Sequence, residues 1–463
     1  MANTEQVARR LVGHVRDVQG QVMTVVCENS YRPPLRELLF KENDESVRFE
    51  AYVYENDRLL KCLMFSNNNS VCRGDVVLST GQEIMVPVGA GVLGRAIDLF
   101  GQPEDGQGPI ATPTWRSIHA PDVKTYQGGY KKPEVLETGI KVIDFFTPIP
   151  KGGKMLLIGG AGVGKTVLLN ELLQGMLQDE SSAAIFAGIG ERSREGHELW
   201  QWLRESGALN RVVLVLGAIH RNAAVRFRTA DAATTLVEYF RDEEQRNVLL
   251  FVDNVYRFLQ AGSELSSIAG EMPSEFGYQP MLQTDIACFE DRLKCNDTQY
   301  VTSVQTMYVP ADEMADPTIS ATVPYVDATL VLSRPIAQQG RFPAVDFIRS
   351  RSQMIDRNVI GLKHYETVTK TYEILSEHER LVKIVSIVGK DELSEEKRIQ
   401  FERGQKILNY LTQPFFSTEI QTGRKGVRVP MRQTVSDIAG ILGGTFDNMP
   451  DDQMLYCGSL SSN

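Results

Sequence analysis

A glycine-rich loop that ends in lysine and threonine is the part of this sequence with the clearest chemistry. Residues 159–166 read Gly-Gly-Ala-Gly-Val-Gly-Lys-Thr, directly after the apolar run 154–158 and at the start of a helical pattern. In such a loop the backbone N–H groups turn inward around nucleotide phosphates, and the N-terminus of the following helix favours their negative charge. Lys165 would then reach the β- and γ-phosphates, and the Thr166 hydroxyl would ligate Mg²⁺.

The rarity of this pattern argues against a chance origin. With 38 glycines among 463 residues, chance gives on the order of 0.02 matches in the chain. The alternative is a glycine-rich turn with an exposed lysine. The strand–loop–helix context favours the phosphate site over that alternative.

Two acidic positions offer the other groups that a nucleotide-hydrolysing site needs. Asp253 closes the apolar run 248–252, where it would support a metal ion through water, although such a residue alone is more often a turn or helix cap. Glu191 follows the apolar run 183–186, at the strand end where loops of a parallel sheet converge on a ligand. It would orient the attacking water. The charged segment 190–196 fits a solvated loop with surface ion pairs equally well.

The elements that would position these groups change character along the chain. Residues 1–85 hold short β-rich runs between turn residues, which predicts a small barrel or sandwich. Residues 86–355 alternate nearly continuous apolar runs with helical stretches, which is typical of a parallel sheet buried on both faces. Residues 356–463 carry apolar residues at helical spacing. We therefore expect a multidomain α/β protein with three domains at these boundaries.

Composition and charge exclude several classes of protein. The 49 Lys and Arg against 59 Asp and Glu leave a formal charge of −10, which argues against an overall basic nucleic-acid-binding protein. No apolar run approaches the ~18 residues of a membrane helix. Six scattered cysteines form no C-x-x-C pair, so we interpret them as reduced packing residues. The first residues lack the pattern of a secretory signal or an organelle presequence.

Taken in order, the motifs resemble those of the catalytic β subunit of F-type ATP synthase. The resemblance rests on the segments 159–166, 190–196, 249–258, 260–264, 277–280 and 308–312. In the last part of the chain, Asp391–Glu396 is similar to the acidic helix–loop motif of that subunit, and Gln413–Phe415 is similar to its adenine-side turn. The similarity covers nearly the whole chain in the same order and is weakest over the first 85 residues.

The resemblance implies a fold and an assembly. The fold would be an N-terminal β-barrel, a central RecA-like P-loop nucleotide domain and a C-terminal α-helical bundle. The chain would alternate with α-type subunits in a hexameric ring around a rotating γ-type stalk, and a membrane sector would translocate H⁺ or Na⁺. No nucleic-acid partner is implied. The complex would lie peripherally at the cytoplasmic face of a bacterial membrane or, alternatively, at the matrix face of the mitochondrial inner membrane.

The resemblance also assigns phosphate, metal and catalytic roles. Lys165 and Arg192 would grip the phosphates of ATP or ADP. Thr166 would bind Mg²⁺ directly, with Asp253 and Glu195 supporting it through water. Glu191 would polarise the attacking water, and Arg257 would lie near the γ-phosphate. The remaining loop positions that would bind nucleotide are Gly159, Gly160, Ala161, Gly162, Val163, Gly164 and Val167.

On the base side, the resemblance implies an aromatic clamp. Phe342 and Phe415 would sandwich the adenine, because aromatic faces hold a purine by stacking. Tyr308 would line the site, and Thr418 would lie beside the base. For the two phenylalanines the alternative is ordinary core packing.

Several positions depart from the family's pattern. Glu271 stands where an arginine is usual, Gln421 takes a commonly aromatic position near the adenine, and Thr418 replaces a smaller residue. Arg349 and Gln353 alter the loop after residues 343–346. Phe342 is a mild change from the usual tyrosine, and the segment 218–226 replaces a Pro-Pro-Gly-bearing stretch. None of these removes a phosphate or metal ligand, so we expect ATP turnover in a divergent paralogue or lineage.

Two alternative functions are consistent with the same layout. A hexameric P-loop ATPase of a secretion or other motor apparatus would share the barrel–RecA–helical order, but Asp391–Glu396 and Gln413–Phe415 favour the synthase. A non-catalytic nucleotide-binding ring component would not need the carboxylate of Glu191.

Overall fold

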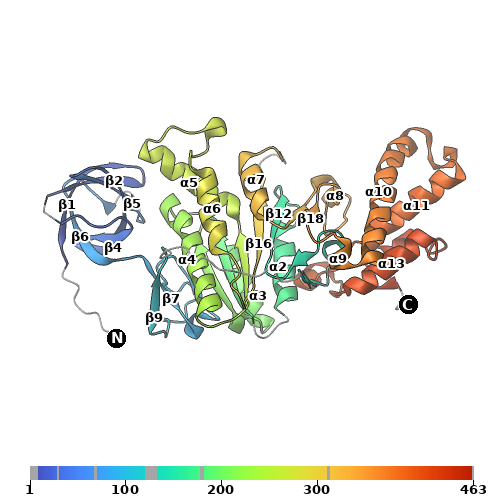
Figure 1. The fold of residues 1–463 in the computed structure, drawn as a ribbon, viewed down its shortest axis with the longest axis horizontal. Helices are drawn as coiled ribbons and strands as arrows, with labels where there is room; N and C mark the ends of the chain where they lie inside the picture. The colour runs from blue at the N-terminus through green and yellow to red at the C-terminus, as the bar shows by residue number, and fades with distance from the viewer. Residues whose placement is uncertain are drawn as a thin grey trace. The chain divides into compact units, whose positions relative to one another are not determined.

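The computed structural model describes residues 9–28, 31–66, 70–119, 133–177, 182–309 and 313–460. The chain divides into two compact units. The first comprises residues 1–129, 181–305 and 315–325, and the second comprises residues 130–180, 306–314 and 326–463. Figure 1 shows the elements of both.

The first unit begins with a closed antiparallel barrel, as the β-rich runs predicted. Its strand order is β1-β2-β5-β4-β3-β6. The strands are β1 (Leu11–Gln19), β2 (Val22–Cys27), β3 (Glu37–Lys41), β4 (Asp44–Asn56), β5 (Leu59–Met64) and β6 (Val76–Glu83). Alternate side chains point inward, so that Val12, Leu39, Phe49 and Leu60 are fully buried in one core.

The first unit also contains parallel strands in the order β16-β15-β13-β14-β8. They are β8 (Ala96–Ile97), β13 (Ala183–Ile189), β14 (Val212–Gly217), β15 (Val248–Asp253) and β16 (Val301–Tyr308), of which residues 301–305 belong to this unit. Every residue of β13 and β15 is buried, which confirms strands covered on both faces. Strand β7 (Met85–Val88), which precedes β8 in the chain, and strand β9 (Thr114–Ser117), which follows it, form a short antiparallel pair.

Helices of the first unit follow the strands in alternation. They are α3 (Ser193–Glu205), α4 (Ala223–Asp242), α5 (Val255–Ala269), α6 (Leu282–Arg292) and α7 (Pro317–Thr322). Helix α4 contacts β13, β14 and β15. It begins at Ala223, because the Asn222 side chain caps it by accepting from the Val225 N–H.

A buried ion pair joins the barrel to α4 within the first unit. Arg228 on α4 donates to both carboxylate oxygens of Glu50 on β4, at 2.9 and 2.5 Å. The Glu50 side chain is fully buried, and Asp231 lies 3.1 Å from the same guanidinium. Burial raises the pKa of Glu50 and the charge of Arg228 opposes that rise. The barrel is thus tied to the helix by a desolvated charge pair that needs both partners.

The second unit holds the remaining strands of the central region. Strand β12 (Lys154–Gly159) pairs in parallel with β17 (Ala328–Val331), which pairs antiparallel with β18 (Arg351–Ser352). A short pair is formed by β10 (Val135–Leu136) and β11 (Ile149–Pro150). The helices near them are α1 (Lys141–Phe146), α2 (Lys165–Met176), α8 (Arg334–Gln338) and α9 (Arg357–Ile360).

The last part of the second unit is helical, as the sequence predicted. Helix α10 (Leu362–Val388) packs against α11 (Glu395–Tyr410) and α13 (Met431–Gly443), and α12 (Glu419–Thr422) lies between the latter two in sequence. The structure as a whole has the expected class: an N-terminal barrel, central parallel strands with helices, and a C-terminal helical region.

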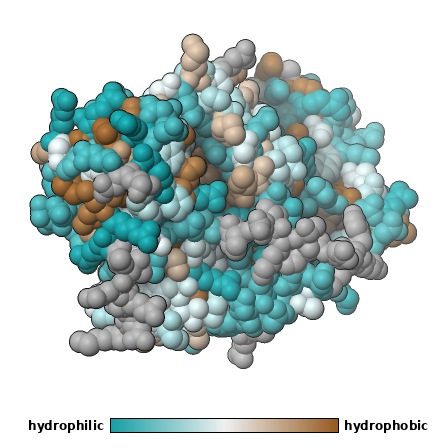
Figure 2. Space-filling model, turned by 60° about the vertical axis from the view of Figure 1, so that its left-hand side comes forward, coloured by the Kyte–Doolittle hydropathy of each residue, from teal (hydrophilic) through white to brown (hydrophobic). Residues whose placement is uncertain are grey.

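The exposed side chains are predominantly hydrophilic on the face drawn in Figure 2, with hydrophobic residues in scattered groups. Across the described ranges, no helix combines the length and the apolar character that a bilayer crossing requires.

Candidate active site

The predicted phosphate loop joins β12 to α2 in the second unit. Strand β12 ends at Gly159 and α2 begins at Lys165, so the loop has the predicted strand–loop–helix context. Gly162 and Gly164 have φ of 75° and 91°, which is the left-handed region that glycine adopts without strain. Gly164 is the N-cap of α2, and no side chain caps this end.

Lys165 is anchored to the loop that it follows. Its Nζ donates to the Gly159 carbonyl oxygen at 2.8 Å and also to the Gly160 carbonyl oxygen. The same nitrogen lies 5.3 Å from the ring centroid of Tyr308, within the range of a cation–π contact. The ammonium is thus held beside the glycine loop, with the Tyr308 ring next to it. Residues 310–312 of the predicted segment 308–312 lie outside the described part of the chain.

A cavity of about 260 Å³ opens next to the end of this loop within the second unit. Its lining includes the loop residues Val163 and Gly164, the next residue Val167, and the predicted base-side residues Phe342, Phe415 and Thr418. Phe342 is 38% exposed while Phe415 is only 5% exposed. The structure therefore brings the predicted base-side aromatics together with the helix end of the phosphate loop.

Helix α2 also fixes the segment that carries Phe415. The carboxylate of Glu171, which is 3% exposed, accepts hydrogen bonds from the backbone N–H groups of Phe416 at 3.3 Å and Ser417 at 3.0 Å. Gln413 donates from its backbone N–H to the Phe342 carbonyl oxygen at 3.0 Å. Both phenylalanines are thereby tied to one framework that includes the phosphate-loop helix.

In the first unit, the predicted acidic residues gather at the carboxyl end of the parallel strands. Asp253 ends β15 and lies opposite Gly188 of the neighbouring strand β13. Gly190 and Glu191 follow Gly188 by two and three residues. Asn254 donates from Nδ2 to Glu191 Oε1 at 3.1 Å, and Asn254 caps α5 by accepting from the Arg257 N–H. This edge is where ligands bind in parallel α/β sheets.

The Glu191 carboxyl has an unusual acidity. Burial, the nearby charge of Asp253 and a hydrogen bond with Glu195 raise its pKa to about 8, and the hydrogen bond from Asn254 opposes this. Three carboxyl groups therefore share one small region, and their mutual repulsion favours the protonated form of Glu191. A divalent cation nearby would relieve that repulsion, so this charge density fits Mg²⁺. Among the described residues, no group of three or more His, Cys, Asp or Glu side chains has the arrangement of an all-protein metal site.

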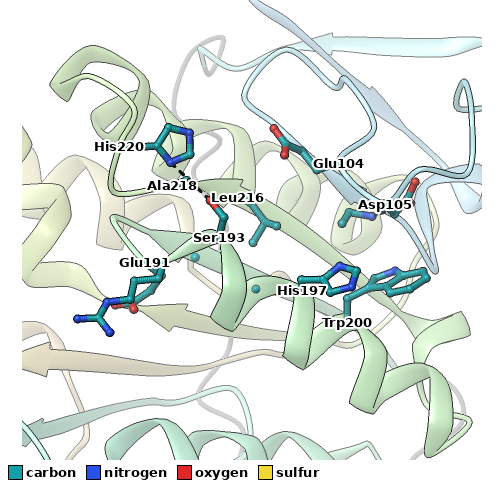
Figure 3. A pocket seen from close by; sticks show the side chains of 13 residues that line it. Glu104, Asp105, Glu191, Ser193, His197, Trp200, Leu216, Ala218 and His220 are labelled. Atoms are coloured by element: carbon teal, nitrogen blue, oxygen red, sulfur yellow. Dashed lines mark hydrogen bonds between the residues drawn. The ribbon is translucent and has the colours of Figure 1, made fainter.

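Glu191 and Arg192 line a cavity of about 240 Å³ in the first unit. Figure 3 shows Glu191 at one end, Ser193, His197 and Trp200 of α3 along the wall, and Leu216 between Ser193 and His197 in this view. The Ser193 hydroxyl lies 3.5 Å from His220 Nδ1. The cavity has room for several water molecules beside the Glu191 carboxyl group.

The other predicted residues of the first unit lie on the helices that follow these strands. Glu195 is in the first turn of α3, whose N-cap is Arg192. The Arg257 side chain packs directly against Gly190, where an added Cβ would approach Arg257 Cβ to 2.8 Å. Arg257 Nη1 donates to Gln260 Oε1 at 2.8 Å. Glycine at 190, with φ of 69°, is therefore required both by the turn and by this close approach.

Comparison with protein families agrees with this arrangement. Residues 139–352 match the nucleotide-binding domain of the ATP synthase alpha/beta family. The chain carries an ATP synthase alpha/beta nucleotide-binding domain. Residues 353–439 match the C-terminal domain of V and A type ATP synthase. ATP and ADP are thus the nucleotides of this domain, and the chain has the domain pair of an ATP synthase subunit.

The second match qualifies one part of the resemblance. The family of the nucleotide domain is confirmed, but the C-terminal model is that of the V and A type and not of the F type. The matches do not separate an α-type from a β-type chain.

Sequence reasoning also missed residues that the structure places at the site. Glu171 occurs at an ordinary helical position, and only the fold shows that it is buried against the Phe416 backbone. Arg424 and Tyr456 line the base-side cavity although neither belongs to a recognised motif. One signal in the sequence pointed to this region: Gln421 occupies a position that is commonly aromatic in the family, and Gln421 lines the same cavity.

Proposed function

We propose that this chain is the catalytic subunit of a rotary ATP synthase/ATPase that makes or hydrolyses Mg-ATP. The observation that carries the proposal is that the ATP synthase alpha/beta domain of this chain contains two features: a glycine loop that holds Lys165, and a carboxyl group, Glu191, with a raised pKa beside a cavity. Phosphoryl transfer needs positioning and charge neutralisation more than covalent chemistry by the protein.

Residues of the second unit would bind and orient the nucleotide. The N-terminus of α2, whose N-cap is Gly164, and the loop N–H groups would favour phosphate oxygens. Lys165 would exchange its bonds to two loop carbonyls for stronger, charge-assisted bonds to phosphate. Phe342 and Phe415 would hold the base by stacking. Thr166 would hold Mg²⁺, which supplies neutralisation of the developing phosphate charge.

Residues of the first unit would supply the hydrolytic chemistry. Glu191 in its ionised form would accept a hydrogen bond from water and orient it for attack, with Asn254 fixing the carboxyl group. Asp253 and Glu195 would support Mg²⁺ through water, which would lower the pKa of Glu191 toward the operating pH. Arg192 and Arg257 would add positive charge at the transferred phosphoryl group.

The assembly that we propose is a hexameric ring in which this chain alternates with an α-type subunit around a γ-type stalk. A membrane sector would couple it to H⁺ or Na⁺ flow, at the cytoplasmic face of a bacterial membrane. The motif series from residue 159 to residue 415 supports an F-type β identity. The C-terminal match instead favours the catalytic subunit of a V or A type enzyme, which is the second candidate.

Purification of the complex from its native source tests the assembly. We expect ATPase activity that co-purifies with this chain, a homologous α-type chain and a single-copy stalk subunit. Identification of every partner by mass spectrometry separates the F-type from the V or A type assembly. Recovery of the chain in a complex without any stalk or ring partner would contradict the proposal.

A further inference from the structure

The base-side cavity of the second unit contains more polar side chains than stacking requires. Most of them are engaged with the protein. Gln413 accepts from the Lys141 N–H and donates to the carbonyl oxygens of Gly139 and Val427. The hydroxyl groups of Thr418 and Thr422 donate to the carbonyl oxygens of Phe415 and Thr418. These groups have little donor capacity left for a ligand.

Arg424 and Gln421 differ from the other lining residues. Both line the cavity and both are exposed. Within the described part of the chain, the guanidinium of Arg424 makes a ring contact and no side-chain hydrogen bond, and the Gln421 amide makes none either. Their hydrogen-bonding groups are therefore available to an occupant of the cavity.

Tyr456 holds Arg424 in place. The guanidinium carbon lies 4.2 Å from the ring centroid of Tyr456, within the range of a cation–π contact. Tyr456 is fixed through both its side chain and its backbone: the side-chain hydroxyl donates to the Gly340 carbonyl oxygen, and the backbone N–H donates to Thr412 Oγ1 at 2.7 Å. Tyr456 has φ of 54°, an unfavourable conformation for a tyrosine, which the surrounding contacts must maintain.

The donor and acceptor pattern of these two side chains fits the edge of a purine. Arginine is only a donor, and it pairs in bidentate fashion with the N7 and O6 acceptors of guanine. Adenine presents N7 but replaces O6 with an amino donor, so it cannot accept both bonds. A glutamine amide both donates and accepts, and it pairs with N6 and N7 of adenine.

We propose that Arg424, supported by Tyr456, and Gln421 are the base-specificity residues of this site, and that Arg424 makes the site accept guanine nucleotides alongside adenine nucleotides. This inference rests on the proposed function, because it takes the cavity to hold the base of the bound nucleotide. It predicts that the guanine edge is read mainly by Arg424 and the adenine edge mainly by Gln421.

The test measures binding of ADP, GDP and inorganic pyrophosphate, each with Mg²⁺, to the full chain by calorimetry. We expect Arg424→Met to weaken GDP binding by about tenfold or more, with ADP changed less than about twofold and pyrophosphate unchanged. Gln421→Leu should weaken ADP binding more than GDP binding. Arg432→Met, an exposed arginine that does not line the cavity, is the matched control and should change none of the three affinities.

Contrary results distinguish a failure of the proposed function from a failure of the base-reading role of Arg424. If neither nucleotides nor pyrophosphate bind to the wild-type chain, the proposed function fails. If all three ligands bind, the base-reading role is wrong in either of two cases: Arg424→Met weakens ADP and GDP binding equally, or it changes the affinity for neither. Loss of pyrophosphate binding in Arg424→Met would show that the arginine acts on phosphate and would also overturn the inference.

Discussion

Glu191 is the residue whose protonation decides the chemistry of the site. A carboxyl group orients and activates water only when it is ionised, and burial together with the charges of Asp253 and Glu195 raises the pKa of Glu191 to about 8. Because the folded-state pKa lies above the ordinary value, the protonated form is favoured at neutral pH. The proposed catalytic form is therefore populated only as pH rises or as a bound cation lowers the pKa.

We accordingly expect kcat/KM for ATP hydrolysis by the purified complex to increase from about pH 6, to reach half of its plateau near the pKa of Glu191, and to level off above it. The free-enzyme pKa governs this ratio, so the profile should be measured as kcat/KM and not as kcat alone. A profile that is already flat at pH 6.5 would contradict the raised pKa, provided that the complex remains intact over the same range.

Lys165 is the residue whose loss should affect binding most. Replacement by alanine removes the ammonium that lies beside the glycine loop, and with it the proposed charge-assisted bond to phosphate, which would be worth about 1.5–3 kcal/mol. We expect the dissociation constant of Mg-ADP for Lys165→Ala to rise by about tenfold or more. Lys363→Ala, at an exposed position of α10, should bind as the wild type does. Equal affinities for the two variants would remove the phosphate assignment.

At the scale of elements, Glu171 connects the phosphate-loop helix to the base-side segment. Its carboxylate accepts from two backbone N–H groups, so Glu171→Ala leaves two part-buried donors without this acceptor, at a cost of up to about 1–3 kcal/mol each. We expect this variant to weaken ADP binding through displacement of Phe415 while pyrophosphate binding stays unchanged. Glu171→Gln retains an acceptor and should recover part of the affinity. Equal weakening of both ligands would point to a general loss of structure.

The ion pair between Glu50 and Arg228 tests how the barrel is attached to α4. Arg228→Met removes one partner and leaves the Glu50 carboxylate buried without its cation, which costs about 3–5 kcal/mol. We expect a lower urea midpoint for Arg228→Met. The double variant Glu50→Leu/Arg228→Met should recover much of this loss, since it removes the unpaired charge. No recovery in the double variant would show that packing and not charge accounts for the loss.

The elements themselves followed from sequence wherever a strong local pattern was present. The apolar runs at 154–158, 183–186 and 248–252 all became buried parallel strands. Their ends were less predictable: β13 continues to Ile189 because the next three residues are also buried. Contacts between distant segments could not be predicted, since Glu171 with Phe416 and Arg424 with Tyr456 depend on how segments pack and not on any local spacing.

At the scale of the whole molecule, the two units divide the proposed work. The second unit contains the phosphate loop and the base-side cavity, and the first contains Glu191, Asp253 and the barrel. The ATP synthase alpha/beta match spans segments of both. The order of the motifs in the sequence predicted that the chain contains a phosphate loop and these acidic residues, because a motif depends only on residues that are close together in the chain. The identity of the ring and stalk partners depends on surfaces that no motif encodes.

The most direct test of a catalytic role compares wild-type and Glu191→Gln chains in the assembled complex. Glutamine preserves size and can keep the hydrogen bond with Asn254, but it cannot take a proton from water. We predict that ATP binding and assembly remain close to wild type while steady-state hydrolysis falls by about 10²–10⁴-fold. Hydrolysis at the wild-type rate in the Glu191→Gln complex would contradict the assignment of this chain as the catalytic subunit.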